Sequence, residues 1–369
     1  MDLLLTEEQA LLRDAAAKLA ASKGGPRRAR VLRDAAIEID QDAWTEMIEA
    51  GWLSAMVAEE DGGLGLGIFD LALALEETGK QIVMTPLAEN ASAIWAVMNA
   101  TDRTHPARAR IESKIVVPAT SLPGQRYDDA ATVSFDPRAS SLSGAVSFVP
   151  FGRSSDLFLV DANAAGETVL CLVSRDAAGL SITTTPNVDG STSSTLRFSH
   201  TSVSSEDIVA RGEAAATTVI AMQERLVLGT AAELLGVAQA AHDMTVGYAK
   251  LREQFGKPIG SFQALQHRMV DCYVDAELNR SLLFRVLSAW DDDTGHPAMV
   301  PAVKARLGKC ALKTVRTALQ LHGAIGYTDE DDIGIYYKRG VALAAKYGNE
   351  MTHVGRFSDL TLPAQRAAG

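Results

Sequence analysis

The stretch 216–255 constrains the fold most, because it contains no proline and is rich in alanine. Proline breaks a helix interior by removing a backbone donor, whereas alanine has the highest helix propensity. We therefore predict one long helix here. Helical patterns continue at 261–290, at 297–323 and around 334–347. The C-terminal part of the chain, 214–369, is thus predicted to be a helical bundle.

The two preceding parts differ in composition from this bundle and from each other. Residues 1–115 show helical patterns, in which Thr6 is placed to cap a first helix and Gly51 to end a second one. Residues 116–213 contain short alternating runs such as ATVSF, AVSFV and TVLCLV, which are typical of strands. No helix is needed between these runs, so the sheet is predicted to be antiparallel.

Bulk properties argue against several classes of protein. A formal net charge of -11 does not suit a nucleic-acid surface. The three cysteines, Cys171, Cys272 and Cys310, lack metal-ligand spacing, so we expect neither a metal site nor a disulfide. The N-terminus does not resemble a signal peptide, and no run approaches the roughly 20 apolar residues that span a bilayer. These features predict a cytoplasmic protein without a membrane span.

The loop DGGLGLGIFD contains Gly63, Gly65 and Gly67, and it could be confused with a dinucleotide-binding fingerprint. That fingerprint requires a strand before the glycines and a βαβ unit around them. Here helical segments flank the loop. We therefore interpret it as a tight connection between two helices.

Two stretches of the predicted bundle carry candidate binding residues. In YAKLREQFGKPIGSFQ, a helix ends near Arg252, and Gly256 and Pro258 turn the chain. A guanidinium at such a break can bind a phosphate through two hydrogen bonds, or it can be a solvated side chain at a capped helix end. In ALQLHGAIGY, Gln320 lies at a helix end. The glycines after it either admit the close approach of a ligand or form a simple turn.

Together, the strings RxQFGxPIxxFQ and QxxGxxGY resemble the acyl-CoA dehydrogenase family in their order and separation. The segment GWLSAMVAEEDGGLGLGIFDLALALEETGK is similar to the family's PExxGGLGL loop and the helix that follows it. The resemblance covers nearly the whole chain. It implies an α+β fold with an N-terminal helical domain, a middle antiparallel β-sandwich-like domain and a C-terminal four-helix bundle.

The resemblance also implies FAD as cofactor, an acyl-CoA thioester as substrate, electron-transfer flavoprotein as electron acceptor, and a dimer or a dimer of dimers. In the family, the two strings of the bundle reach the flavin of the neighbouring subunit. The cofactor-binding residues carried over from them are Arg252, Gln254, Phe255, Gln263, Gln320, Gly323 and Gly326.

The family's chemistry requires a base. A proton leaves Cα of the thioester while a hydride leaves Cβ for the flavin, and the base is a carboxylate in a dry pocket. Many members carry it as a glutamate in an EGT string beyond the QxxGGxG motif. Counted without gaps, that string falls on Tyr347–Gly348–Asn349, so Tyr347 occupies the glutamate position. A phenol with a pKa of about 10 is a poor base at neutral pH.

Other members carry the base on the long helix before the RxxFG motif. The local string QERLVL nominates Glu224, although an ungapped count from Arg252 falls on Leu226 and a small bulge would be needed. Glu233 lies on the same helix face as Leu226 and is the second candidate. Glu233 can instead be a polar residue that pairs with a side chain of another helix and takes no part in the chemistry. A third possibility is that this chain carries no base.

The middle domain departs from the family as well. The family's T-E-P-x-x-G-S-D loop has no counterpart in ATSLPGQRYDDA, and its W-I-T string beside the flavin becomes Phe148–Val149–Pro150. Proline lacks both the backbone donor and the threonine hydroxyl. The chain thus retains the elements that serve a neighbour's flavin and lacks those that serve its own.

This pattern resembles the weaker subunit of heteromeric acyl-CoA dehydrogenases, which are known among bacterial enzymes for bulky substrates such as sterol side chains. The partner would then be a paralogous subunit, and the chain alone would have little activity. Three alternatives stay open. They are a self-sufficient dehydrogenase that uses Glu224 or Glu233, a flavin monooxygenase of the same fold, and an assembly or binding protein without flavin.

Overall fold

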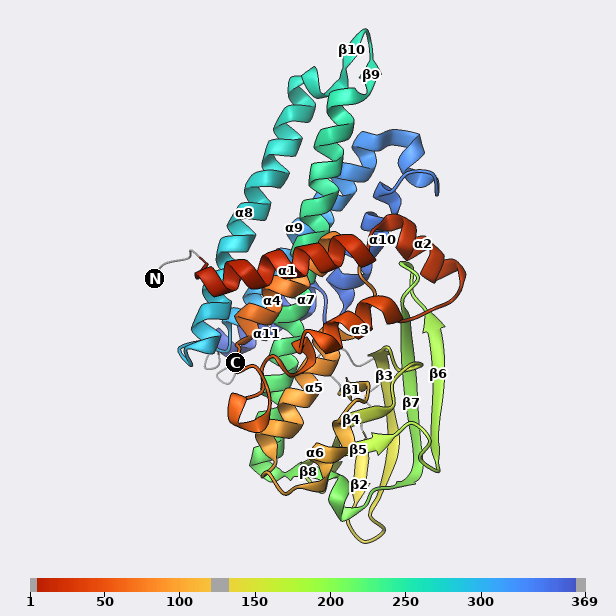
Figure 1. Cartoon of the computed structure of the whole chain (residues 1–369), viewed down its shortest axis with the longest axis vertical. Helices are drawn as coiled ribbons and strands as arrows, with labels where there is room; N and C mark the ends of the chain where they lie inside the picture. The colour runs from red at the N-terminus through yellow and green to blue at the C-terminus, as the bar shows by residue number, and fades with distance from the viewer. Residues whose placement is uncertain (1–4, 121–132, 363–369) are drawn as a thin grey trace, which may run out of the picture. The chain divides into compact units, whose positions relative to one another are not determined.

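The computed structural model describes residues 5–120 and 133–362, and its order of helices, sheet and helices confirms the predicted α+β class (Figure 1). The N-terminal helices are α1 (Glu7–Lys23), α2 (Pro26–Asp34), α3 (Gln41–Glu49), α4 (Ile68–Lys80), α5 (Leu87–Ala100) and α6 (Pro106–Ile111).

Both predicted helix boundaries in this part are confirmed. The Thr6 hydroxyl accepts a hydrogen bond from the Gln9 backbone amide (3.1 Å), and Gln9 Oε1 accepts one from the Thr6 amide (3.2 Å). This reciprocal pair satisfies amides that the first turn of α1 leaves without partners. Gly51 follows α3 with φ 74°, the left-handed conformation that commonly ends a helix.

The strands of the middle part form one sheet. They are β1 (Val116–Ala119), β2 (Ser134–Asp136), β3 (Ser141–Pro150), β4 (Leu157–Ala164), β5 (Glu167–Ser174), β6 (Leu180–Pro186), β7 (Thr192–Ser202) and β8 (Ile208–Arg211). Their order is β6-β7-β3-β2-β4-β5-β8, with β1 beside β4. Most neighbours are antiparallel as predicted, but β1 and β2 pair with β4 in parallel. The expectation of a purely antiparallel sheet was wrong there, because the connection from β1 to β4 runs through other strands and is long enough for a parallel pair.

The C-terminal part consists of long helices with a small hairpin between the first two. Its elements are α7 (Gly212–Leu251), β9 (Glu253–Gln254), β10 (Lys257–Pro258), α8 (Gln263–Asp291), α9 (Met299–His322), α10 (Ile333–Ala345) and α11 (Glu350–Thr361). The long helix predicted at 216–255 is confirmed, but it ends at Leu251, before the REQF segment. Helices α8, α10 and α11 all pack against α9.

Helix α11 was not predicted. Asn349 caps it, since its side-chain oxygen accepts a hydrogen bond from the Thr352 amide (3.0 Å), and Glu350 stands in its first turn. Both are ordinary helix start signals that the sequence offered.

The chain forms two compact units. The bundle unit contains Met1–Val31, Ile68–Val83 and Val227–Gly369, and the sheet unit contains Leu32–Gly67 and Met84–Leu226. The N-terminal helices contribute to both. The predicted domain boundaries near 115 and 213 were drawn where the sequence composition changes, whereas the two units are defined by spatial compactness. These domain boundaries stay predictions.

Within the bundle unit, two glycines allow α4 and α7 to cross with their backbones in contact. A Cβ atom on Gly79 would lie 2.2 Å from the carbonyl oxygen of Glu233, and one on Gly236 would lie 2.0 Å from that of Glu76. These distances are far inside van der Waals contact. The crossing therefore requires glycine at both positions.

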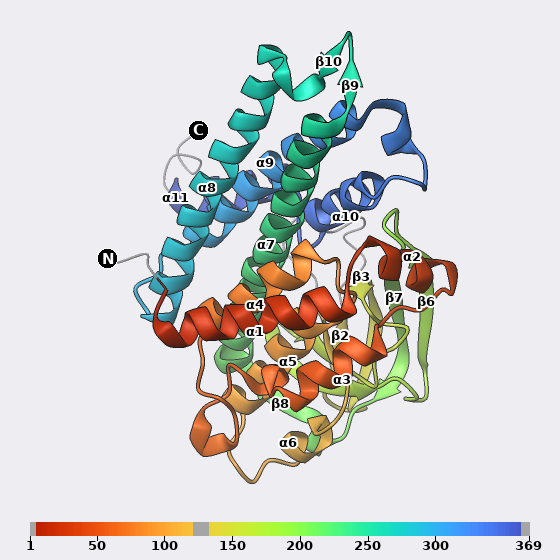
Figure 2. The same ribbon diagram turned by 45° about the horizontal axis from the view of Figure 1, so that its top comes forward.

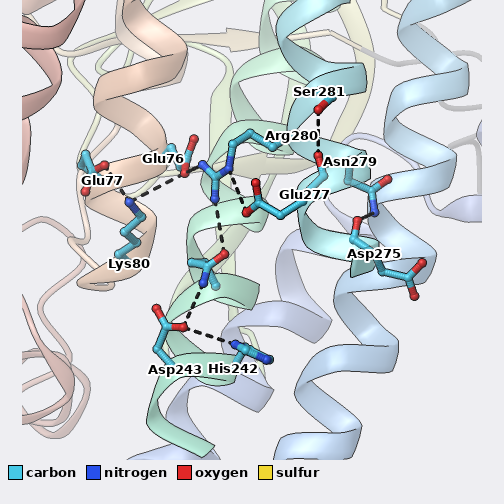
Figure 3. Close-up of polar contacts among 11 residues, drawn as sticks. Glu76, Glu77, Lys80, His242, Asp243, Asp275, Glu277, Asn279, Arg280 and Ser281 are labelled. Atoms are coloured by element: carbon cyan, nitrogen blue, oxygen red, sulfur yellow. Dashed lines mark hydrogen bonds and ion pairs between the residues drawn. The ribbon is translucent and has the colours of Figure 1, made fainter. Parts of the chain in front are cut away.

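A network of charged and polar side chains joins α4, α7 and α8 in the same unit (Figure 3). The buried carboxylate of Glu76 pairs with Arg280 of α8, and it lies 3.7 Å from Lys80 Nζ. Arg280 also donates to Gln239 Oε1 of α7 over 3.3 Å. Buried charges require partners of this kind, so these contacts fix how the three helices align.

The glycine-rich loop connects helices, as predicted. The backbone amides of Leu64, Gly65 and Leu66 donate to carbonyls of residues 54–57, and a short 3-10 helix precedes them. Helix α4 follows at Ile68. No strand leads into these glycines among the described residues, so the dinucleotide-binding interpretation is excluded.

Candidate functional site

The hairpin tip between α7 and α8 is a tight turn with exposed side chains. Its central residues, Phe255 and Gly256, have φ values of 54° and 80°, as in a type I′ hairpin. The Ile259 amide donates to the carbonyl of Arg252 (2.8 Å) and closes the tip. Arg252, Gln254 and Phe255 are exposed, Phe255 to 91%. The backbone is thus fixed while the predicted binding side chains face outward.

Gln263 begins α8 directly beside this turn and is also exposed. The preceding Phe262 anchors the turn through its ring. Lys257 Nζ lies 4.4 Å from that ring's centroid, and Phe255 meets the ring edge-on with centroids 6.1 Å apart. These contacts order the tip without using Gln263, which stays available to a ligand.

The end of α9 carries the second predicted motif. Gln320 is exposed in the last turn, and Gly323 follows with φ 70° and ψ -145°. No atom lies within 4 Å of the position that a Cβ on Gly323 would take, so this side of the turn is open. Gly326 differs, since it is buried and a Cβ there would lie 3.0 Å from Ile333 Cγ2. Packing within the chain accounts for Gly326, whereas Gly323 leaves room for a ligand.

Tyr248 and His322 bring the two motifs together. Their rings stack with centroids 4.2 Å apart and an interplanar angle of 13°, and the Tyr248 hydroxyl donates to the His322 carbonyl over 3.4 Å. Tyr248 lies one helical turn before Arg252, and His322 directly precedes Gly323. Both ribbon views show the hairpin tip and the α9–α10 connection at the same end of the bundle unit (Figures 1 and 2).

Glu233, one of the two predicted bases, is paired within the bundle. Arg339 of α10 donates to Glu233 Oε1 through Nε over 3.2 Å and also through Nη2. Both side chains are buried. The carboxylate of Glu233 is therefore engaged in an ion pair between α7 and α10. This geometry matches the paired polar residue that the sequence offered as the alternative.

Glu224, the other predicted base, is buried on the part of α7 that belongs to the sheet unit. Its neighbours along the helix are engaged in that unit. Gln223 Nε2 donates to Thr120 Oγ1 over 3.3 Å, and the Arg225 guanidinium stacks over Trp95 at 3.5 Å from the ring centroid. Leu226, the residue at the ungapped position, is fully buried.

Tyr347 lies in the turn between α10 and α11, which is where the family's EGT string was expected. It is buried, has φ 56°, and its carbonyl accepts a hydrogen bond from His353 Nε2 over 2.9 Å. Asn349 caps α11 from the third position of the string. The turn therefore keeps a definite structure although no carboxylate stands at Tyr347.

Lys304 of α9 holds this turn from within the bundle. Its ammonium is buried and donates to the carbonyls of Leu343, Ala344 and Gly348, each over 3.1 Å. Three acceptors match the three donors of an ammonium group. Burial, followed by the charge of Lys346, lowers the pKa of Lys304 to about 7.

The segment Phe148–Val149–Pro150 closes β3 beside an irregularity in its pairing with β7. The register shifts between Val146 and Val149, and Phe148 has φ 62° and is half exposed. A proline at the end of this strand offers no amide to a ligand. The sequence ATSLPGQRYDDA, compared above with the family's T-E-P-x-x-G-S-D string, lies almost entirely outside the described residues, since 121–132 are not among them.

Across residues 5–120 and 133–362, no group of three or more His, Cys, Asp or Glu side chains is arranged to hold a metal ion. The three cysteines are buried and form no disulfide. None of the described helices combines the length and apolar character that crossing a membrane requires.

Comparison with known proteins identifies the relatives of this chain. It matches the acyl-CoA dehydrogenase N-terminal domain over residues 6–103 and the acyl-CoA dehydrogenase C-terminal domain over residues 211–350. It is 30% identical to acyl-CoA dehydrogenase IpdE2 of Mycolicibacterium smegmatis, over 93% of this chain and 96% of that protein. The chain belongs to the acyl-CoA dehydrogenase family.

Solved structures agree with this assignment to the acyl-CoA dehydrogenases. A variant of the Tcur3481-Tcur3483 steroid ACAD is 28% identical, with a TM-score of 0.84 over 98% of this chain and 99% of that one. The ChsE4-ChsE5 complex from Mycobacterium tuberculosis, at 24% identity, shares the fold with a TM-score of 0.86, over 98% of this chain and 99% of that one. FAD is the cofactor of the acyl-CoA dehydrogenase family, which confirms the predicted cofactor.

The described residues fit a flavin nucleotide at the end of the bundle unit. An exposed guanidinium, exposed amide side chains and the open side of Gly323 are suited to the phosphates and polar groups of FAD. The sequence motifs point to these groups but not to Tyr248 and His322, which join them. The signal that could have found them was spacing, since Tyr248 precedes Arg252 by one helical turn and His322 adjoins Gly323.

Proposed function

We propose that this chain is the degenerate subunit of a heteromeric acyl-CoA dehydrogenase. It contributes Arg252, Gln254, Phe255, Gln263, Gln320 and Gly323 to FAD bound with a paralogous subunit, and it lacks a complete active site of its own. The bound flavin supplies the hydride acceptor for α,β-dehydrogenation of an acyl-CoA thioester, and electron-transfer flavoprotein is the proposed electron acceptor.

The main support is the outward direction of the hairpin tip. Arg252, Gln254 and Gln320 are exposed, and the turn at Gly323 is open on one side. Side chains arranged in this way can bind a ligand held by another subunit. An exposed phenylalanine such as Phe255 also favours a covered state in the assembly, because burying its ring removes apolar surface from water.

The state of the candidate bases supports the same proposal. Abstraction of an α-proton requires a carboxylate within hydrogen-bond reach of Cα. Tyr347 occupies the expected position and carries a phenol, and Glu233 is paired with Arg339. The Phe148–Val149–Pro150 segment lacks the threonine hydroxyl of the family string. Together, these departures support the proposal that the chain's own active site no longer has to carry out dehydrogenation.

Helix α8 offers a surface for the partner subunit. Its inner side is filled by Cys272, Ala276 and Leu283, which are buried. Its opposite side presents apolar residues that are about half exposed, namely Val270, Tyr273, Val274 and Leu278. Apolar side chains four residues apart form one continuous stripe on a helix. The 28% identical steroid ACAD carries two protein names, Tcur3481 and Tcur3483, which is in keeping with a mixed assembly.

A second candidate is a self-sufficient dehydrogenase that uses Glu224. The observation in its favour is that Glu224 is a buried carboxylate on the long helix, within the QERLVL string. Glu224 is therefore the residue that the decisive experiment must test.

The experiment compares the chain purified alone with the chain co-expressed with a paralogous acyl-CoA dehydrogenase subunit of the same genome. Gel filtration, flavin absorbance and a dye-coupled assay with short, medium, branched and sterol-derived acyl-CoAs are measured on both. We expect a colourless, inactive lone chain and a yellow, active mixed assembly that loses FAD on dialysis when Arg252→Ala is introduced.

Other results would contradict the proposal in recognisable ways. Robust turnover by the lone chain that disappears in Glu224→Gln would identify a self-sufficient enzyme. A yellow lone chain that consumes oxygen without dehydrogenating acyl-CoA would identify a monooxygenase. A mixed assembly without flavin would identify an assembly or binding protein.

A further inference from the structure

We infer that His322 is a positioning residue that holds the Gln320–Gly323 turn against the hairpin tip, so that both flavin-contacting motifs keep one geometry. This inference rests on the proposed function, because the residues that His322 would position are those proposed to contact FAD. His322 itself is buried and faces the protein interior.

The first contact is the ring stack with Tyr248. The two rings are nearly parallel with centroids 4.2 Å apart, and the Tyr248 hydroxyl donates to the His322 carbonyl. The Tyr248 carbonyl accepts the Arg252 amide over 2.8 Å. A movement of the His322 ring is therefore transmitted to the last turn of α7, which positions Arg252, and to Gly323 through the peptide bond.

The second contact is with Asp331. His322 Nδ1 lies 3.0 Å from Asp331 Oδ2, and Asp331 Oδ1 accepts the Ile333 amide over 2.9 Å at the start of α10. An ionised carboxylate only accepts hydrogen bonds, so Nδ1 carries the proton. The imidazole is thereby held at one edge by the carboxylate and on one face by the Tyr248 ring, which fixes its position and its orientation.

The backbone at Asp331 is itself held by the N-terminal part of the bundle unit. Arg30 of α2 donates from Nη2 to the Asp331 carbonyl over 3.1 Å, and from Nη1 to Asp332 Oδ1 over 2.6 Å. A chain of polar contacts thus runs from Arg30 through Asp331 to His322, and the stack continues it to Tyr248. Such supporting contacts are what a binding site requires to hold its ligand-facing groups in place.

Packing alone does not explain a histidine at this position. Its second nitrogen, Nε2, is buried and has no hydrogen-bond partner among the described residues. A buried nitrogen without a partner costs stability, whereas a phenylalanine would stack on Tyr248 without that cost. What the histidine adds to the stack is the bond from Nδ1 to Asp331, which ties the turn at Gly323 to the start of α10.

The test measures FAD affinity in the FAD-containing assembly by flavin fluorescence at a temperature well below unfolding. His322→Leu removes both the stack and the bond, and His322→Phe keeps the stack and removes only the bond. We expect at least about tenfold weaker FAD binding for His322→Leu and an intermediate loss for His322→Phe, since misplaced groups bind a ligand less well. Asp331→Asn should reproduce the loss of His322→Phe.

His242 provides the matched control. It is also buried, lies 3.2 Å from an aspartate (Asp243) through Nδ1 and 3.1 Å from the Met269 carbonyl through Nε2, and neighbours Tyr273 with ring centroids 6.0 Å apart. It stands on α7, well before Arg252. His242→Phe should lower the melting temperature as a structural change does, and leave FAD affinity unchanged.

The outcomes separate this inference from the proposed function. Arg252→Ala serves as the reference, and if it leaves FAD affinity unchanged, the proposed function is wrong and the inference falls with it. If Arg252→Ala weakens FAD binding while His322→Leu and His322→Phe bind FAD as the wild type does, only the inference is overturned. Since His322→Leu can fail to fold, the affinity of His322→Phe decides in that case.

Discussion

Arg339 of α10 and Glu233 of α7 form an ion pair inside the bundle unit, with Nε 3.2 Å from Oε1 and only 4% and 7% of the two residues exposed. The backbone carbonyl of the same glutamate faces Gly79 of α4. Glu233 therefore lies where three helices meet, and its carboxylate is committed to holding α10 on α7.

The first prediction is that Glu233→Gln is a stability variant. Removing one partner leaves the Arg339 charge buried and uncompensated, which costs about 3–5 kcal/mol. Urea unfolding should show this loss. The double variant Glu233→Leu/Arg339→Leu should recover most of it, because two apolar side chains replace the pair. A Glu233→Gln protein that unfolds like the wild type but has lost acyl-CoA dehydrogenation would show that Glu233 acts as the base.

The second prediction concerns Tyr347, which stands at the expected glutamate position. Tyr347→Phe removes one hydroxyl and leaves the ring, the φ of 56° and the bond from His353 to its carbonyl in place. The dehydrogenation rate of the assembly should stay within about tenfold of the wild type. A rate lower by about a thousandfold, in a variant of unchanged melting temperature, would reveal a chemical role for the phenol.

The third prediction is a pH dependence that originates at His353. Burial, together with the charge of Lys304, lowers the pKa of His353 to about 3. In the unfolded chain the pKa is about 6.5, so between these values the unfolded state binds a proton that the folded state does not. Stability must fall as the pH falls below about 6.5, by up to about 1.4 kcal/mol for each pH unit.

Urea unfolding at about pH 7, 6 and 5 measures this slope, since these values bracket the upper part of the window. His353→Leu loses the hydrogen bond to Tyr347, so it should be less stable at neutral pH, but its stability should fall less steeply on acidification. Parallel curves for the variant and the wild type would mean that His353 does not contribute to the slope.

The fourth prediction compares two glycines of α7. A Cβ on Gly236 would lie 2.0 Å from a backbone oxygen of α4, whereas one on Gly247 would meet no atom within 4 Å. Gly236→Ala should therefore destabilise the protein by about 1–3 kcal/mol or more through overpacking. Gly247→Ala should stabilise it by about 0.4–1 kcal/mol, because alanine restricts the unfolded chain. Thermal unfolding of both variants tests the α4–α7 crossing, and equal effects would argue against it.

The fifth prediction concerns the apolar stripe on α8. Val274→Glu combined with Leu278→Glu introduces two like charges at its centre, which cannot pair with each other, and should prevent the mixed assembly from forming, because a desolvated charge without a partner is costly. Arg268→Glu, at an exposed position of the same helix outside the stripe, is the control and should assemble normally. Co-purification of the tagged chain with its partner gives the answer. Normal assembly of the stripe variant would place the interface elsewhere.

Much of the fold was predictable because it depends on local signals. The N-cap at Thr6 and the turn at Gly51 act within a few residues, and both formed as expected. The proline-free stretch formed one long helix, which ends at Leu251, before the REQF segment. The parallel pairing of β1 with β4 was not predictable in this way. It depends on how distant segments meet, which the alternating pattern within each strand does not encode.

In the candidate site too, residues in short sequence strings could be predicted, whereas contacts between distant residues could not. Arg252, Gln320 and Gly323 were all nominated from their sequence strings. The pairing of Glu233 with Arg339, which is distant in sequence, could only be offered as one of two alternatives, because sequence alone does not show which polar residues of different helices meet. The stack of Tyr248 on His322 escaped prediction for the same reason.

The exposed hairpin tip has a consequence for how the cell produces this protein. Leu251 and Phe255 are exposed to 83% and 91%, on a turn whose backbone is already fixed. A newly made copy therefore presents a rigid apolar end from the moment it folds. If the chain is a subunit of a mixed assembly, as proposed, the amount synthesised should be matched to that of the partner, because copies in excess would leave this apolar end uncovered and associate with one another.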